Sequence, residues 1–209
     1  IQISFHRMNK VLEINEELAY AVVEPGVRWF DLHDAVKAAG YALMTPCPDL
    51  GWGSVIGNQM DNGVTYQPYG VDQQNLCGLE VVLPDGDLLR TGMGAQEGNK
   101  AWNLYRRTLG PTLDPLFTQA NYGIVTKAGV WLKRLPESYI PTMLTIWDDA
   151  DLEQAIDTIR ELKMGGYLEG VPTLYPTLRA AVMLRDDAVL DARTQITPDT
   201  YREIAERTG

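Results

Sequence analysis

The chain has 209 residues, of which 45% are hydrophobic and 22% charged, so it can bury a sizeable core and is not an intrinsically disordered chain. Its 28 acidic residues outnumber its 18 basic residues, and the formal net charge of −10 argues against nucleic acid as a partner. No apolar run approaches the roughly 18 residues that a membrane-spanning helix needs, so a membrane partner is not expected either.

The N-terminal part of the chain predicts two strands followed by a helix. Apolar residues dominate 10–14 and 18–24, and a polar turn separates the two runs. Residues 29–39 then carry apolar side chains at helical spacing, and Gly40 closes the pattern. We therefore expect a β-β-α beginning.

A glycine-rich stretch from Pro46 to Asn58 follows this helix and is the best candidate for a ligand loop. Glycine has no Cβ, so the backbone N–H groups at Gly51, Gly53 and Gly57 can approach a flat or anionic ligand closely. The spacing does not match the dinucleotide-binding fingerprint, and no P-loop ending is present. On local sequence alone, a turn cluster without a ligand is equally compatible.

Two side chains near this loop are candidates for chemistry. Asp49 lies at the mouth of the loop, beside Pro48, where partial burial would suit an acid that works at a ligand. Tyr66 carries a phenol that can donate a hydrogen bond to a developing oxyanion. From local sequence alone, a turn aspartate and a packing tyrosine are the favoured interpretations. No His, Cys or Asp cluster has the spacing of a metal site, so no metal is expected.

Further along the chain, the sequence predicts a hairpin, a short helix and a long strand. The apolar runs 79–83 and 88–91 flank Asp85-Gly86, a pair that predicts a type I′ turn because both central residues then need positive φ. Residues 102–109 are the helix candidate, and the β-branched run 123–132 is the strand candidate.

A change of pattern at 134–141, where two prolines interrupt any regular structure, predicts a second domain. Beyond it, 143–147 predicts a strand, and 152–163 predicts an amphipathic helix preceded by capping acids. We expect an α+β chain with one domain at 1–136 and the beginning of another at 137–209.

The ends of the chain predict a piece of a longer protein. The chain opens on Ile1 rather than Met, in a run that already alternates like a strand, and it closes on a helical pattern. Only two cysteines are present, which favours a reducing, cytoplasmic location and leaves a periplasmic or peroxisomal one open.

Several blocks of sequence carry a resemblance to a known family. They are PDLGWGSVIGN at 48–58, DNGVTYQPYG at 61–70, GLEVVL at 78–83, LRTGMG at 89–94, GPTLD at 110–114 and FTQANYGIVTK at 117–127. In this order, and nearly without gaps over residues 9–132, they resemble the flavin-binding domain of the vanillyl-alcohol oxidase and p-cresol methylhydroxylase family.

The resemblance implies a fold and an activity. The fold is an FAD-binding domain of that type, a mixed sheet with flanking helices, followed by the start of an α+β substrate (cap) domain. The activity is FAD-dependent oxidation of a para-substituted phenol, such as a 4-alkylphenol or a 4-hydroxybenzyl alcohol, in the catabolism of aromatic compounds. Hydride passes from the benzylic carbon to flavin N5, and the p-quinone methide left behind reacts with water or rearranges.

The resemblance also assigns roles to residues. It implies that Asp49 lies beside flavin N5, assists hydride transfer and acts as a base toward the attacking water. It also implies that Tyr66 helps to hold the phenolic oxygen as phenolate. The cofactor-binding positions that it implies are Pro48, Asp49, Gly53, Ser54, Gly57, Asn58, Asp61, Gly123, Ile124 and Val125. Asp61 is the least specific of these, because the family often has glutamate there.

Two other functions stay open: a flavin oxidase of a sugar or hydroxy acid, and a truncated, non-catalytic binding module. The family's first pyrophosphate loop would precede residue 10, and further phenolate partners would follow residue 209. We therefore expect the isolated chain to be inactive and to bind FAD weakly or not at all. For the full-length protein the resemblance implies a phenolic substrate, O2 or a cytochrome c as electron acceptor, and a homo-oligomer.

Overall fold

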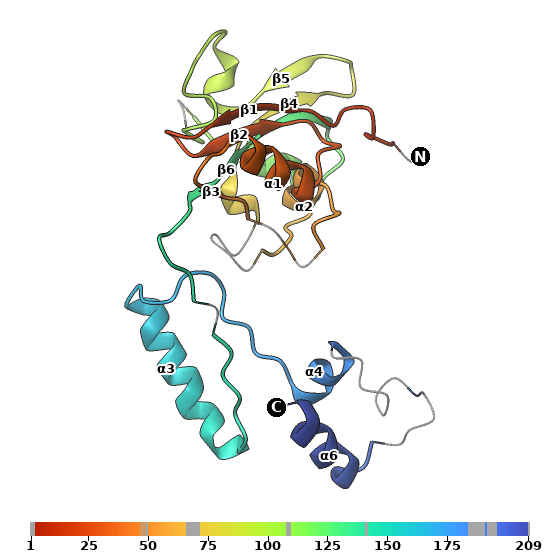
Figure 1. Ribbon diagram of the computed structural model, residues 1–209. Helices are drawn as coiled ribbons and strands as arrows, with labels where there is room; N and C mark the ends of the chain where they lie inside the picture. Colours follow the sequence, from red (N-terminus) through yellow and green to blue (C-terminus); the bar gives the residue numbers. More distant parts are fainter. Residues whose placement is uncertain are drawn as a thin grey trace. The chain divides into compact units, whose positions relative to one another are not determined.

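The computed structural model describes residues 3–46, 48, 50–65, 72–107, 110–140, 142–183, 191 and 196–208. Its internal contacts divide the chain into two compact units, Ile1–Tyr139 with Glu169–Val171 and Ile140–Leu168 with Pro172–Gly209. Figure 1 shows the strands in the first unit and helices in the second. The division into functional domains at residue 136 stays a prediction.

Five strands form the main sheet of the first unit in the order β1-β2-β6-β4-β5. Their bounds are β1 Val11–Asn15, β2 Tyr20–Val23, β4 Leu76–Val82, β5 Leu88–Arg90 and β6 Ile124–Trp131. The α+β class is confirmed, but every strand pair of the described residues is antiparallel, so the expected mixed sheet is wrong in that detail. Short turns join β1 to β2 and β4 to β5, and a short turn can connect only antiparallel neighbours.

The remaining elements of the first unit are short. A second, two-stranded sheet pairs β3 Leu43–Met44 with β7 Lys133–Arg134. The helices are α1 Trp29–Ala38 and α2 Val55–Met60, and the 3-10 helices are η1 Asp72–Asn75, η2 Gly92–Ala95 and η3 Asp114–Phe117. Figure 1 shows α1 and α2 together on one face of the main sheet.

The core lies between these two helices and the sheet. α1 buries Trp29, Leu32 and Val36, which share one helical face, and α2 adds Val55 and Ile56. In the same cluster the sheet contributes Ala21, Val23, Leu79, Val81, Ala128 and Val130. The strands predicted at 10–14 and 18–24 and the helix predicted at 29–39 are confirmed, with ends that differ by one or two residues.

The hairpin predicted around Asp85-Gly86 is present, but its turn is not type I′. Gly86 has a φ of 92°, whereas Asp85 is not among the described residues with positive φ. Gly86 N–H donates to Leu83 O and Leu83 N–H donates to Asp87 O, both at 2.9 Å, so the loop has three residues. Pro84 holds its φ at about −65°, and a three-residue loop with one left-handed glycine satisfies that restraint.

The helix predicted at 102–109 is wrong, because its described residues form turns. Arg106 Nε donates to Leu76 O at 2.6 Å, and Trp131 Nε1 donates to Asn103 O at 2.8 Å. These contacts hold the segment against β4 and β6. Tertiary hydrogen bonds therefore override the weak local preference for a helix.

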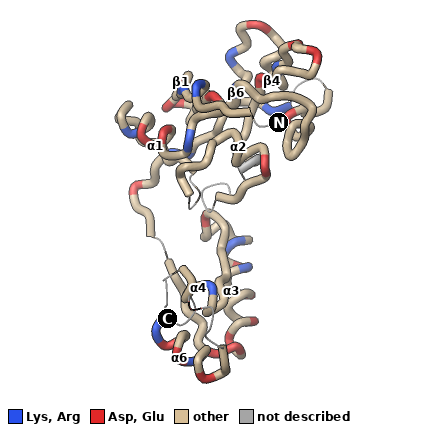
Figure 2. The backbone as a smooth tube through the Cα atoms, turned by 90° about the vertical axis from the view of Figure 1, so that its right-hand side faces the viewer, with Lys and Arg blue, Asp and Glu red and all other residues tan. Residues whose placement is uncertain are grey.

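The second unit contains α3 Leu152–Met164, α4 Thr177–Met183 and α6 Pro198–Thr208, with the 3-10 helix η4 Asp149–Asp151 before α3. α4 and α6 contact each other, and each supplies one fully buried residue, Ala181 and Ile204. The helix predicted at 152–163 is confirmed, and Asp148 accepts a hydrogen bond from Ala150 N–H at 2.9 Å before it. α3 has no buried residue and carries charges of both signs (Figure 2).

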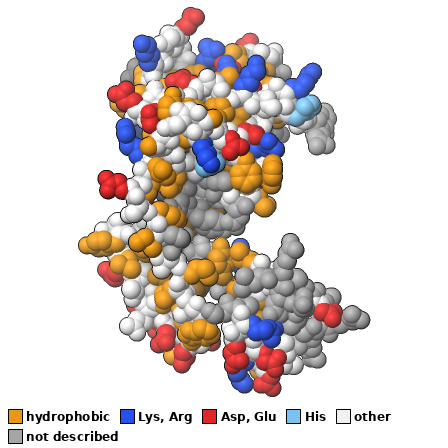
Figure 3. Space-filling view, viewed as in Figure 1, with side chains coloured by type: hydrophobic (Ala, Val, Ile, Leu, Met, Phe, Trp, Pro, Cys, Tyr) orange, Lys and Arg blue, Asp and Glu red, His pale blue; other side chains and the backbone are white. Residues whose placement is uncertain are grey.

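The strand predicted at 143–147 is wrong, because these residues pair with no strand of the described chain. A strand depends on a neighbour for its backbone hydrogen bonds. Met143, Leu144 and Trp147 are instead 96%, 69% and 69% exposed, and Figure 3 shows hydrophobic side chains at the surface of this unit. None of the described helices has the length and apolar character that crossing a bilayer requires.

Truncating the buried face of α1 should destabilise the first unit. We expect Leu32→Ala to lower the free energy of unfolding by about 2–5 kcal/mol, because Leu32 is fully buried and the substitution leaves a cavity. Lys37→Ala, on the exposed face of the same helix, should change it by less than about 0.5 kcal/mol. Urea unfolding followed by tryptophan fluorescence measures both. Equal effects would contradict the packing of α1 on the sheet.

The β1-β2 hairpin should lose stability at high pH. Tyr20 O–H donates to Glu13 Oε1 at 2.5 Å, and burial, followed by this hydrogen bond, raises the pKa of Tyr20 from 10.0 to about 12. A pKa raised by folding gives stability that is complete below the unfolded value and is lost as pH rises through the folded value. We therefore expect stability to fall between pH 10 and 12, and to fall less in Tyr20→Phe. Parallel pH profiles of the two proteins in urea unfolding would exclude this role of Tyr20.

Candidate cofactor site

The glycine-rich loop is bound by its backbone to the start of α1. Trp29 N–H donates to Gly53 O at 3.1 Å, and Phe30 N–H donates to Gly51 O at 3.0 Å. A Cβ on Gly51 would overlap the ring of Phe30. The loop can therefore lie this close to the helix only with glycine at that position.

Arg28 and Trp52 cover the outer side of the same contact. The Arg28 guanidinium lies 5.1 Å from the centre of the Trp52 ring, and this ring meets Phe30 edge-on at 5.0 Å. Arg28 also pairs with Asp31 at 2.6 Å, and this hydrogen bond keeps the pKa of Asp31 below its ordinary value. Reasoning from the sequence did not single out Arg28 or Trp52. The only local signal is a tryptophan between two glycines, which by itself does not identify a partner.

Ser54 connects the loop to α2. Its hydroxyl accepts a hydrogen bond from Gly57 N–H at 3.0 Å and donates one to Pro25 O at 2.6 Å. Ser54 is thus the N-cap of α2 and ties the loop to the chain before α1. The candidate residues Gly53, Ser54 and Gly57 are brought into one turn, in which both glycines are exposed.

Asn58 follows in α2 and is held by Gly63. Gly63 N–H donates to Asn58 O at 2.8 Å, and a Cβ on Gly63 would overlap the Asn58 side chain. Asn58 Nδ2 is buried and has no hydrogen-bond partner among the described residues, and the same holds for the hydroxyl of Thr65. An unpaired buried polar group costs free energy, so these atoms are open positions for hydrogen bonds to a ligand.

Gln119 joins this loop to the second candidate segment, 123–125. Its backbone N–H donates to Met60 O at 2.7 Å, and its side chain donates to Asp61 at 3.3 Å (the carbonyl) and 3.5 Å (Oδ1). Gln119 has a φ of 49°, a left-handed conformation that residues other than glycine rarely adopt. Asp61 therefore connects the end of α2 to Gln119, a contact for which the local sequence holds no signal.

The candidates Gly123, Ile124 and Val125 lie where β6 begins beside β4. Ile124 pairs with Val82, and Val125 pairs with Val81. A Cβ on Gly123 would overlap the Val81 side chain, so glycine is required there for the strands to approach. Packing against β4 is thus one physical reason for this glycine, independent of a ligand.

Of the three remaining candidates, the structure describes one. Pro48 is described and half-buried. Asp49 and Tyr66, the two predicted catalytic residues, lie outside the described residues. Their positions and roles stay predictions.

The described residues fit a flavin nucleotide. Gly53 and Gly57 are exposed and carry no Cβ, so a flat group can approach the loop closely there. Their N–H groups are not free as expected from the sequence, because Gly53 N–H donates to Leu50 O at 3.1 Å and Gly57 N–H donates to Ser54 Oγ at 3.0 Å. Asn58 Nδ2 and the Thr65 hydroxyl add unpaired buried groups, and amide and hydroxyl donors suit the oxygen and nitrogen acceptors of a flavin and its phosphates. Cofactor binding at these positions stays a prediction.

Comparisons with known proteins relate the chain to FAD-binding proteins. Residues 1–92 match the family model described as an FAD binding domain. The flavoprotein subunit of 4-cresol dehydrogenase [hydroxylating] from Pseudomonas putida is 41% identical over 174 residues, which are 82% of this chain and 33% of that protein. The chain spans about a third of the length of this curated relative.

Two solved structures are similar over most of the chain. p-Cresol methylhydroxylase with substrate bound superposes with a TM-score of 0.92 at 34% identity, covering 97% of this chain and 40% of that one. The 4-ethylphenol oxidase from Gulosibacter chungangensis, in complex with isoeugenol, has a TM-score of 0.68 at 46% identity, covering 75% of this chain and 30% of that one.

Removing the Ser54 hydroxyl should loosen the loop. We expect Ser54→Ala to lower the free energy of unfolding by about 1 kcal/mol, the usual cost of losing an N-cap. Ser54→Thr keeps a hydroxyl that can bond both Gly57 N–H and Pro25 O, so it should retain most of the stability. Urea unfolding of the three proteins checks this. An alanine variant as stable as the wild type would mean that the cap does not hold α2.

Proposed function

Because the chain belongs to the vanillyl-alcohol oxidase and p-cresol methylhydroxylase family of FAD-dependent oxidoreductases, we propose that the protein oxidises para-substituted phenols. Its cofactor is FAD. The substrate class is that of 4-alkylphenols and 4-hydroxybenzyl alcohols. Within this proposal, the described part of the chain serves to bind and orient the cofactor.

The observation that supports this most directly is that hydrogen bonds connect the end of α2, which follows the glycine-rich loop, to the segment that precedes 123–125. The Gly51–Asn58 loop lies against the start of α1, and Gln119 ties the end of α2 to the stretch that leads into 123–125. Both segments were assigned to FAD by family resemblance alone. Two segments meant to hold one cofactor must lie close together, and the Gln119 contacts are compatible with that requirement.

The chemistry divides between the cofactor and the chain. Bound FAD would supply the hydride acceptor that phenol oxidation requires. Tyr66 would stabilise the phenolic oxygen as phenolate, which makes loss of hydride from the benzylic carbon easier. Asp49 would assist the hydride transfer and would then accept a proton from the water that adds to the resulting p-quinone methide. The Asn58 amide would donate a hydrogen bond to the cofactor, and the exposed glycine at Gly53 would let the cofactor lie close to the loop.

The electron acceptor is part of the same proposal. Either O2 or a c-type cytochrome can reoxidise a reduced flavin, and the relatives include both a dehydrogenase and an oxidase. The full-length enzyme is given 4-cresol, and its rate of oxygen consumption is compared with its rate of cytochrome c reduction. The faster reaction identifies the electron acceptor. Turnover with lactate or glucose, and none with any 4-alkylphenol, would overturn the phenol assignment.

Asp49 should matter for the reductive half-reaction. In the full-length enzyme we expect Asp49→Asn to slow reduction of bound FAD by 4-cresol by more than about tenfold, as expected for loss of an acid–base group. Anaerobic stopped-flow absorbance of the flavin measures this rate. Asp34→Asn, at an exposed position on α1, is the matched control and should reduce at the wild-type rate. If Asp49→Asn also reduces at that rate, Asp49 has no part in the chemistry.

A further inference from the structure

A β-bulge interrupts β6 directly after the candidate cofactor segment. Glu80 of β4 pairs with Lys127, but the next residue, Val81, pairs with Val125. Thr126 is therefore an extra residue that faces no residue of its own on β4. A bulge of this kind bends the strand and changes its register.

The bulge decides which way the segment 123–125 faces. Successive residues of a strand point to opposite sides, so a shift of one residue moves every side chain to the other face. With the bulge, Val125 lies opposite the fully buried Val81 and packs against the core. Without it, Thr126 would occupy that position and Val125 would turn to the face of Glu80.

Steric crowding at Gly123 makes this register specific. Removing the bulge would advance the chain by one residue, so Ile124 would take the place of Gly123 beside β4. A Cβ at that place would overlap the side chain of Val81 and approach Val82 O to 2.9 Å. Only the bulged register puts glycine where a side chain does not fit.

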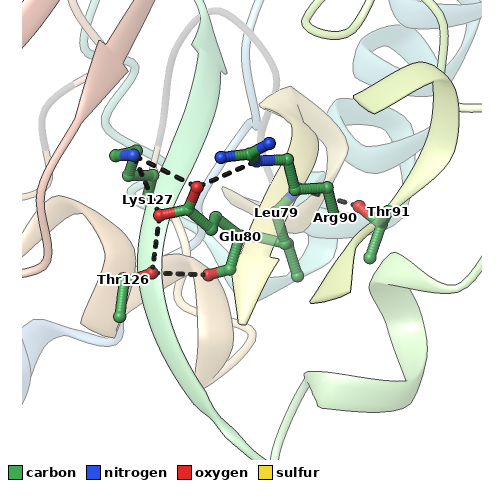
Figure 4. A network of polar contacts seen from close by, with 6 residues as sticks. All are labelled: Leu79, Glu80, Arg90, Thr91, Thr126 and Lys127. Carbon is green, nitrogen blue, oxygen red and sulfur yellow. Dashed lines mark hydrogen bonds and ion pairs between the residues drawn. The ribbon is translucent and has the colours of Figure 1, made fainter. Parts of the chain in front are cut away.

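Glu80 holds the bulged residue. The Thr126 hydroxyl lies 3.1 Å from Glu80 Oε1 and 3.3 Å from Glu80 O, so it can donate to either oxygen. The same carboxylate accepts from Lys127 Nζ, 2.9 Å from Oε1, and from Arg90 Nε, 3.0 Å from Oε2. Figure 4 shows the carboxylate between these groups. Because Arg90 belongs to β5, the carboxylate is anchored from both neighbouring strands.

The carboxylate stays ionised at neutral pH. Only 5% of Glu80 is exposed, and burial raises the pKa of its carboxyl, but the hydrogen bonds from Lys127, Arg90 and Thr126 outweigh burial and hold that pKa below its ordinary value. A hydrogen bond to an ionised acceptor is about twice as strong as one between neutral groups. The Thr126 hydroxyl therefore has a strong acceptor that is fixed in place.

We propose that the contact between Glu80 and Thr126 locks the register of 123–125, so that Thr126 is a positioning residue for the cofactor strand. The inference rests on the proposed function, because 123–125 was assigned to FAD by family resemblance. Thr126 acts through the backbone of 123–125.

The test uses Thr126→Val in the full-length protein, which keeps the branched shape and removes the hydroxyl. FAD is titrated into the apoprotein by fluorescence quenching, and the visible circular dichroism of the bound flavin is recorded. We expect the dissociation constant for FAD to rise about five- to tenfold, because a strand out of register presents other backbone groups to the cofactor, and the dichroism to change. Thr126→Ser should restore both to wild-type values.

Thr91→Val is the matched control. The Thr91 hydroxyl accepts from Leu79 N–H at 2.8 Å, so this variant also breaks a buried hydrogen bond on β4, but on the side away from β6. It should lower the melting temperature of the apoprotein as Thr126→Val does, and leave the FAD dissociation constant and the flavin dichroism unchanged. A stability effect alone would move the two variants together.

The outcomes separate this inference from the proposed function. A wild type that binds no FAD contradicts the proposed function. A wild type that binds FAD, with Thr126→Val and Thr91→Val behaving alike in affinity and dichroism, contradicts only the register lock. If Thr126→Val does not fold, Glu80→Gln replaces it, and it should weaken FAD binding and alter the flavin dichroism in the same sense. Unchanged affinity and dichroism in Glu80→Gln would equally overturn the inference.

Discussion

The described part of the candidate cofactor site depends on the close backbone contact between the glycine-rich loop and the start of α1. The first N–H groups of a helix have no acceptor within the helix. Here the carbonyls of Gly51 and Gly53 accept from Phe30 and Trp29, so the loop satisfies the helix and the helix fixes the loop. The chain continues directly from this contact into the Ser54 cap and α2, which carries the buried Asn58 Nδ2 that has no partner among the described residues.

The second candidate segment, 123–125, lies in the main sheet and also depends on close packing. Gly123 permits β6 to approach β4, and the bulge at Thr126 puts that glycine at the crowded position. Gln119 has a left-handed backbone conformation. In this conformation its backbone N–H and its side chain both donate hydrogen bonds to the end of α2. Local strain of this kind persists only where the surrounding contacts over-determine the geometry.

The second unit is held together differently from the first. α4 and α6 share a small buried contact, whereas α3 buries no residue. α3 is supported locally, by the Asp148 cap ahead of it and by the pair of Arg160 and Asp157 at 2.9 Å. Such local contributions are individually small, and a helix of 13 residues is marginal in water without packing on its apolar face.

Elements with a local signal can be predicted from the amino-acid sequence alone. The 29–39 helix, the strands of both hairpins and α3 follow from periodicity and turn residues, and the family resemblance pointed to FAD. Tertiary structure decided the rest: the turns in place of a helix at 102–107, the unpaired chain at 143–147, and the roles of Trp52 and Gln119. These depend on partners that are distant in sequence, and the spacing of residues along a chain carries no information about which distant backbone a side chain will meet.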